Sequence, residues 1–301
     1  MRRTISFRAS PQPNTPPPDP VSLEIETRSD LSKDDFPLFK KLMTSEDRAA
    51  TDYESAAVEL MKLSGMERVG KISSAKRPDM VAHALRTIVE IKCRIADGRT
   101  LEECLHRIAP SLIAKLREGT FTLEEMPEEE WHAFLRGFVG CYENYINGAD
   151  KQIASLRAAG FSDYSGGVLI IDSGMPGVNL SNIGHGLCKL LEQMKSQGKA
   201  KNVDYVLYYV MDRYIDTPRG QLPTMLIAIA GNQHDMDVAN AVADKISLMQ
   251  ANAVRCFQPS IKIASQTAQS ETLPDGRVVV LRGYVPTNVR WSLAPDMEPS
   301  G

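Results

Sequence analysis

Apolar and polar residues follow one another along the chain in patterns that predict helices and strands in turn. From Thr51 the apolar positions recur at helical spacing until Gly65, which predicts an amphipathic helix. Extended segments follow at residues 67–73, 78–82 and 87–93, and the last begins with a β-branched run that favours a strand. This part of the chain is therefore predicted to run helix, strand, strand, strand.

The middle of the chain is predicted to be mostly helical. Helices are expected at residues 100–117 and 127–146, and another over residues 149–159 ends at Gly160. The apolar run from Gly166 to Asp172 is typical of a buried strand. The helical stretch over about residues 97–147 thus has the character of an insertion.

Helices and strands continue to alternate towards the C-terminus. The expected elements are a helix at 183–196, strands at 205–211 and 225–230, a helix at 236–251, and short strands at 260–264 and 277–285. Such alternation is characteristic of α/β proteins. We expect an α/β fold with a central mixed sheet flanked by helices, a helical insertion, and a C-terminal α/β extension over residues 176–292 that continues the same domain.

The two ends of the chain have no such periodicity. Prolines crowd between Pro11 and Pro20, so residues 1–37 are predicted to be a Pro-rich disordered tail, and residues 293–301 a flexible one. A solvated spacer is the favoured interpretation of the proline run, and a docking peptide for a protein partner is the alternative.

Composition narrows the class of protein. A formal net charge of −3 excludes a globally basic protein, so a nucleic acid would have to be held by a local basic patch. The five cysteines contain no CxxC pair, which argues against a disulfide framework and a zinc ribbon. No apolar run approaches the roughly 18 residues of a membrane span. We therefore expect a soluble, cytoplasmic protein with no membrane partner.

Two acids and a lysine lie on two adjacent predicted strands. Asp79 begins one strand, and Glu90 and Lys92 lie two residues apart on the next, so they share one face. A turn near residues 83–86 would pair the strands as a hairpin and bring Asp79 close to Glu90. Paired carboxylates suit Mg²⁺, whose remaining ligands are waters and phosphate oxygens, and a nearby lysine can stabilise developing charge. The three residues predict metal-dependent phosphate chemistry.

The pair Pro78-Asp79, followed after a ten-residue gap by Glu90-Ile91-Lys92, resembles the motif of the PD-(D/E)XK nuclease superfamily. The layout is most similar to Holliday-junction-resolvase-type endonucleases, on the residues Glu54, Gly65, Ser73-Ser74, Asp79, Glu90 and Lys92. The resemblance implies a restriction-endonuclease-like core over residues 38–175.

The resemblance also implies roles for individual side chains. Asp79 and Glu90 would be metal ligands, Glu54 would assist metal or water binding, and Lys92 would be catalytic. In several branches of the superfamily a glutamine or lysine on the next helix also enters the site. Lys151 and Gln152 lie at that position, and Gln152 is the favoured residue of the two.

Each of these residues also has a structural interpretation. Glu90 and Lys92 are a possible solvent-facing pair on an edge strand, and Asp79 a turn cap. Glu54 is also part of a capping box that begins at Thr51. Glu59 is expected to be solvated and is a reserve candidate.

Further polar residues carry weaker expectations. Asp172 and Asp212 lie at predicted strand ends, where acids are common. A basic rim that holds a phosphate backbone is expected from Lys71, Lys76, Arg77, Arg86, Arg94 and Arg99.

The expected function is a nuclease that uses Mg²⁺ or Mn²⁺ to hydrolyse phosphodiester bonds, with DNA favoured over RNA as the nucleic-acid partner. Two alternatives stay open. One is a catalytically silent nuclease-fold module that acts in nucleic-acid binding or protein assembly, and the other is an RNA-cleaving toxin or effector. A protein partner bound through the Pro-rich N-terminal tail or the C-terminal extension also stays open, as does a homo-oligomer.

Overall fold

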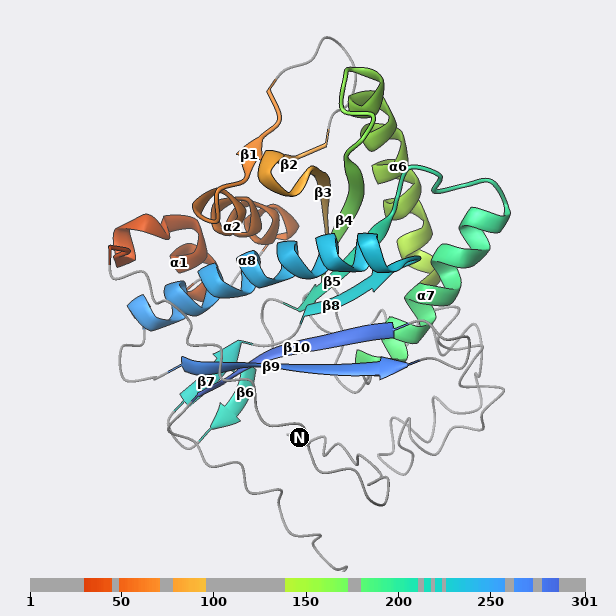
Figure 1. Cartoon of the computed structure of the whole chain (residues 1–301). Helices are drawn as coiled ribbons and strands as arrows, with labels where there is room; N and C mark the ends of the chain where they lie inside the picture. The colour runs from red at the N-terminus through yellow and green to blue at the C-terminus, as the bar shows by residue number, and fades with distance from the viewer. Residues whose placement is uncertain are drawn as a thin grey trace, which may run out of the picture.

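The chain is an α/β protein with a mixed sheet flanked by helices (Figure 1). The computed structural model describes residues 30–44, 49–70, 78–95, 139–172, 180–210, 214–217, 220–223, 226–257, 263–272 and 278–286. Six strands, in the order β1-β2-β3-β4-β5-β8, form the mixed sheet, and β10 and β9 extend it. The predicted fold class is thus confirmed at the level of an α/β mixed sheet with flanking helices.

The elements have the following bounds. The helices are α1 (Pro37–Thr44), α2 (Ala50–Leu63), α6 (Glu143–Ala158), α7 (Leu180–Ser196) and α8 (Gln233–Phe257), with the 3₁₀ turns η1 (Lys33–Asp35), η2 (His83–Leu85) and η4 (Gly140–Tyr142). The strands are β1 (Glu67–Arg68), β2 (Met80–Ala82), β3 (Thr87–Arg94), β4 (Ser165–Asp172), β5 (Tyr205–Val210), β6 (Tyr214–Thr217), β7 (Gly220–Pro223), β8 (Leu226–Ala230), β9 (Ile263–Thr272) and β10 (Val278–Pro286).

The centre of the sheet is parallel and its flanks are antiparallel. β1, β2 and β3 form an antiparallel meander, β3, β4 and β5 run parallel, and β8 and β10 are antiparallel to their neighbours. Every residue of β4 is buried, as expected for a strand that is covered on both faces. Gly167 is needed there because any side chain at that position would overlap the ring of Tyr205 on β5.

The two faces of the sheet are covered by different helices. The main apolar core packs α1, α2 and α8 against one face, where Val89, Ile91 and Cys93 of β3 point. Figure 1 shows α2 and α8 together on that side of the sheet. Because side chains alternate along a strand, Glu90, Lys92 and Arg94 point to the opposite face, where α6 packs on β3 and β4. The polar residues of β3 therefore lie beneath α6.

Several predicted elements need correction. The expected break between helices near residues 147–149 is wrong, because Glu143 to Ala158 form one continuous helix with Gly148 inside it. The hairpin of β6 and β7 was not predicted. The strand expected at 260–264 ends too early, since β9 covers Ile263–Thr272, whose sequence is too polar for a hydrophobic pattern to reveal it, and residues 260–262 lie outside the described residues.

Other predictions fall outside the described residues. These are most of the helical insertion, residues 96–138, most of the Pro-rich tail, residues 1–29, and the C-terminal tail. Within the described part of the chain no helix is both long enough and apolar enough to cross a membrane.

Candidate active site

The β2–β3 hairpin brings Asp79 and Glu90 together. Its register pairs Met80 with Val89 and Val81 with Ile88, so one further step places Asp79 opposite Glu90. Directly opposed residues of antiparallel strands share a face. The predicted turn is formed by η2 and by Arg86, which has a left-handed backbone with φ 48°. The geometric part of the prediction, the approach of the two acids, is thus confirmed.

The edge of β3 beyond its pairing with β2 is occupied by carboxylates. β2 pairs with β3 only as far as Val89, so the next N–H groups along that edge need other acceptors. The Ile91 N–H donates to Asp79 Oδ2 at 2.9 Å, and the backbone of Cys93 interacts with the carboxylate of Glu54. Asp79 and Glu54 are therefore fixed where the sheet opens between β2 and β3.

Glu90 is a buried carboxylate with one oxygen unused. Its side chain is 1% exposed; Oε1 pairs with Lys92 Nζ, and Oε2 has no hydrogen-bond partner in the described part of the chain. Burial, followed by the nearby Asp79 carboxylate, raises the pKa of Glu90 to about 7, against the opposing effect of Lys92. A buried oxygen of this kind beside a second carboxylate favours a proton or a cation as its partner.

Lys92 links the acids to α6. Its Nζ contacts Glu90 and lies 3.5 Å from Gln152 Oε1, and its side chain is 25% exposed to solvent. Gln152 is half-buried, whereas the neighbouring Lys151 is exposed on the outer side of the helix. Of the two candidates on this helix, the structure brings Gln152 and not Lys151 to the acids.

Glu54 belongs to the same group of charges. The capping role at the start of α2 is taken by Asp52, whose Oδ2 accepts from the Ala49 N–H at 3.0 Å. Burial, and then the Asp79 carboxylate, raises the pKa of Glu54, while Lys92 and the Cys93 backbone lower it. The capping-box interpretation of Glu54 is therefore wrong.

Glu59, the reserve candidate, has a structural role. It is buried rather than solvated, and its carboxylate accepts from the N–H groups of Leu38 at 3.0 Å and Phe39 at 2.9 Å. These donors lie in the first turn of α1, where helical N–H groups lack partners within the helix. Glu59 thus attaches α1 to α2.

The acids fit a divalent cation with few protein ligands. Across the described ranges, no group of three or more His, Cys, Asp or Glu residues is arranged to hold a metal ion. Mg²⁺, however, is usually held by one or two carboxylates together with waters and substrate phosphates. Asp79 and Glu90 supply two carboxylates, and the unpartnered Oε2 of Glu90 is a free ligand atom. The residues therefore fit Mg²⁺ or Mn²⁺.

A second polar cluster lies at the C-terminal ends of the parallel strands, and sequence reasoning did not assemble it. The register pairs Arg94 of β3 with Asp172 of β4, and Asp172 Oδ2 accepts from the hydroxyls of Tyr142 and, at 3.0 Å, Tyr208. The Arg94 guanidinium lies 5.2 Å from the centroid of the Tyr142 ring, and its Nη1 is 2.7 Å from Cys141 Sγ. The available signal was the spacing of Glu90, Lys92 and Arg94, which puts three charges on one face.

The predicted basic rim is only partly testable. Arg94 is buried beneath α6 and does not contribute to a rim, and Arg86 is paired with Asp163. The other members, Lys71, Lys76, Arg77 and Arg99, lie outside the described residues, as does Asp212.

Comparisons with protein-family models, with curated proteins and with solved structures give no match to the chain.

Proposed function

We propose that the chain is a metal-dependent nuclease that hydrolyses phosphodiester bonds, with DNA as the expected substrate. The observation that carries the proposal is the meeting of Asp79, Glu90 and Lys92 on one face of the β2–β3 hairpin, with one buried oxygen of Glu90 unpartnered. The order α2, β1, β2, β3, α6, β4 agrees with a restriction-endonuclease-like core, which the motif implies.

Each side chain has a task in this proposal. Asp79 and Glu90 would hold the Mg²⁺ or Mn²⁺ ion, which would polarise the phosphoryl group and lower the pKa of a bound water. The Lys92 ammonium faces the developing negative charge on the phosphoryl oxygens, and Gln152 orients that ammonium. Water would form the new P–O bond as the P–O bond to the leaving sugar oxygen breaks. Glu54 would take the proton that the water loses, and the leaving oxygen would take a proton from solvent.

A second candidate is a catalytically silent module with the same fold. The contact between Lys92 and Glu90 also suits this reading, because it neutralises the buried charge without any metal. Metal binding separates the two, since the silent module does not need it.

The test compares cleavage of plasmid, linear duplex, single-stranded DNA and RNA in Mg²⁺ or Mn²⁺ by the wild type and by Asp79→Ala and Lys92→Ala. Lys151→Ala is the matched control, because this exposed lysine is adjacent to Gln152 but points away from the acids. We expect EDTA and both site variants to abolish cleavage, and the control to cut normally. Absence of both cleavage and metal-dependent thermal stabilisation in the wild type would favour the silent module.

A further inference from the structure

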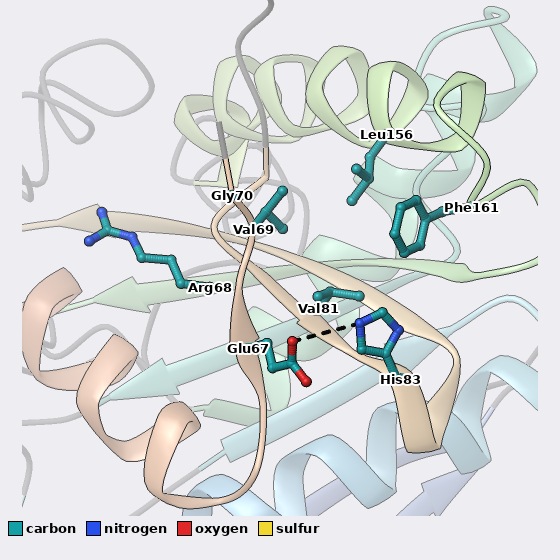
Figure 2. Close-up of a pocket in the computed structure, with 8 residues that line it drawn as sticks. All are labelled: Glu67, Arg68, Val69, Gly70, Val81, His83, Leu156 and Phe161. Carbon is teal, nitrogen blue, oxygen red and sulfur yellow. Dashed lines mark ion pairs between the residues drawn. The ribbon is translucent and has the colours of Figure 1, made fainter. Parts of the chain in front are cut away.

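A pocket of about 230 Å³ lies between the β1–β2 edge of the sheet and the C-terminal half of α6 (Figure 2). Its lining includes Glu67, Val69, Val81, His83, Leu156 and Phe161. Figure 2 shows Val69, Leu156 and Phe161 turned towards a common space, whereas Arg68 points away from it. Val69, Val81 and Leu156 are buried, so the inner wall of the pocket is apolar.

The pocket adjoins the candidate active site on the same face of the sheet. Val81 lies two residues beyond Asp79 on β2, a step of about 7 Å along a strand. Leu156 lies four residues beyond Gln152 on α6, a step of about 6 Å along a helix. Val69, which lines the pocket, is also in direct contact with Asp79 of the candidate active site, because the Val69 N–H donates to the Asp79 carbonyl at 3.1 Å. A nucleic-acid strand held at the acids can therefore reach the pocket with its next nucleotide.

Two rings and a carboxylate define the mouth of the pocket. The rings of His83 and Phe161 have centroids 6.0 Å apart and are tilted by 35°. His83 Nδ1 is 3.0 Å from the Tyr164 hydroxyl, which orients the imidazole, and the Glu67 carboxylate lies 3.9 Å from His83 Nε2. The Glu67 side chain is 72% exposed to solvent, so its carboxylate can accept hydrogen bonds from a ligand at the rim of the pocket.

These features suit a flat ligand with apolar faces and polar edges. The pocket is smaller than the roughly 300–1,000 Å³ of sites for drug-sized molecules, which is consistent with a single ring system. Aromatic side chains bind nucleobases by stacking, with little dependence on sequence. A carboxylate at the rim accepts hydrogen bonds from the amino groups of adenine, cytosine or guanine.

We infer that this pocket binds one unpaired nucleobase of a single-stranded nucleic acid, next to the phosphodiester that Lys92 and the metal ion at Asp79 and Glu90 would hold. The inference rests on the proposed nuclease function and specifies its substrate class. The strand enters between the β1–β2 edge and α6, and the base beside the reacting phosphate stacks against Phe161 and His83. A base inside a duplex cannot do so without leaving its partner.

The test measures binding by Lys92→Ala in Mg²⁺, because this variant is expected to keep the metal ligands Asp79 and Glu90 but not to cleave. Short single-stranded DNAs, each with one 2-aminopurine at a successive position, are titrated with the full chain. We expect the fluorescence of one position to change on binding, and an abasic nucleotide at that position to weaken binding roughly tenfold. A duplex of the same sequence is expected to lack the fluorescence change.

Two variants and a control, each combined with Lys92→Ala, assign the signal to the pocket. Phe161→Ala removes the stacking ring and Val69→Phe fills the space, and both are expected to abolish the fluorescence change and weaken single-strand binding roughly tenfold. Leu38→Ala alters an exposed apolar side chain on α1, outside the pocket, and is expected to bind as Lys92→Ala alone does. Circular dichroism checks that each variant is folded, and the abasic series needs no variant at all.

The outcomes separate the pocket from the nuclease activity. One outcome would contradict base binding in the pocket and still support the nuclease proposal. In that outcome cleavage depends on Lys92, but the fluorescence changes at no position and an abasic nucleotide has no effect. A fluorescence change that is lost in Phe161→Ala, together with a wild type that cuts nothing, would support the pocket and overturn the nuclease. Equal binding of duplex and single strand with no abasic effect also contradicts the inference.

Discussion

At the scale of single residues, Glu90 is an acid buried in the middle of a strand whose other face packs in the apolar core. Placing a carboxylate there is unfavourable unless it gains a proton, a cation or hydrogen bonds. Lys92 satisfies one oxygen and nothing in the described part of the chain satisfies the other. The residue therefore makes the stability of the metal-free protein depend on pH.

We predict that the metal-free wild type becomes less stable as the pH rises from about 4.5 to about 7. The folded-state pKa of Glu90 is raised to about 7 from 4.5 by burial and by Asp79, so in this range the folded state binds more protons than the unfolded state. The loss is up to about 3 kcal/mol. Urea denaturation in EDTA at several pH values measures it. Glu90→Gln is expected to flatten the dependence, and an unchanged slope in that variant would contradict the assignment.

Gln152 and Lys151 are adjacent on α6, but we expect their alanine variants to differ in cleavage rate. Gln152→Ala removes the amide that contacts the Lys92 ammonium, so we expect the single-turnover cleavage rate to fall roughly tenfold to a hundredfold. Lys151→Ala changes an exposed side chain and is expected to leave the rate within about twofold. Equal rates for both variants would remove Gln152 from the site.

Sequence reasoning reached Asp79, Glu90 and Lys92 because their placement depends only on the alternation of side chains and on one short hairpin. It could not reach the cluster of Arg94 and Asp172, since these residues meet through the parallel register of β3 and β4. β3 and β4 are far apart in the sequence, so their pairing cannot be derived from local sequence patterns.

At the scale of elements, helices and strands with strong apolar periodicity were predicted well, as with α2, β3 and β4. Elements whose stability comes from tertiary contacts were not. β9 is polar along its length and is specified by its pairing with β10, and α6 continues through Gly148 because its inner face packs on β3 and β4. Intrinsic propensity is a weak prior where such packing exists.

The attachment of α1 to α2 through Glu59 gives a prediction for stability alone. Glu59→Ala leaves the Leu38 and Phe39 N–H groups without their acceptor, which should cost about 1–3 kcal/mol of unfolding free energy. Because Glu59 lies outside the group of Asp79, Glu90 and Glu54, the shift in melting temperature caused by Mg²⁺ is expected to stay the same. Loss of that shift would place Glu59 in the metal site.

At the scale of the whole molecule, one sheet joins the predicted core to the C-terminal extension. β5 pairs with β4, and β8, β10 and β9 follow in the same sheet, so strands from both predicted parts of the chain share one sheet. The polar row of Glu90, Lys92 and Arg94 crosses beneath α6 from the hairpin to the C-terminal ends of the central strands. Asp172 lies at the end of this row. Its carboxylate accepts hydrogen bonds from the hydroxyls of Tyr142 in η4 and Tyr208 in β5, and it interacts electrostatically with Arg94.

We predict that Asp172 and Arg94 stabilise the whole fold as a coupled pair. Asp172→Leu leaves the Arg94 charge buried with less compensation and should lower the unfolding free energy by about 3–5 kcal/mol. Asp172→Leu combined with Arg94→Met removes both charges and should recover much of this loss. A double-mutant cycle in urea measures the coupling, which we expect to exceed about 1 kcal/mol. Additive effects of the two single variants would show instead that Asp172 acts through the Tyr142 and Tyr208 hydroxyls alone, and that the polar row ends at Arg94.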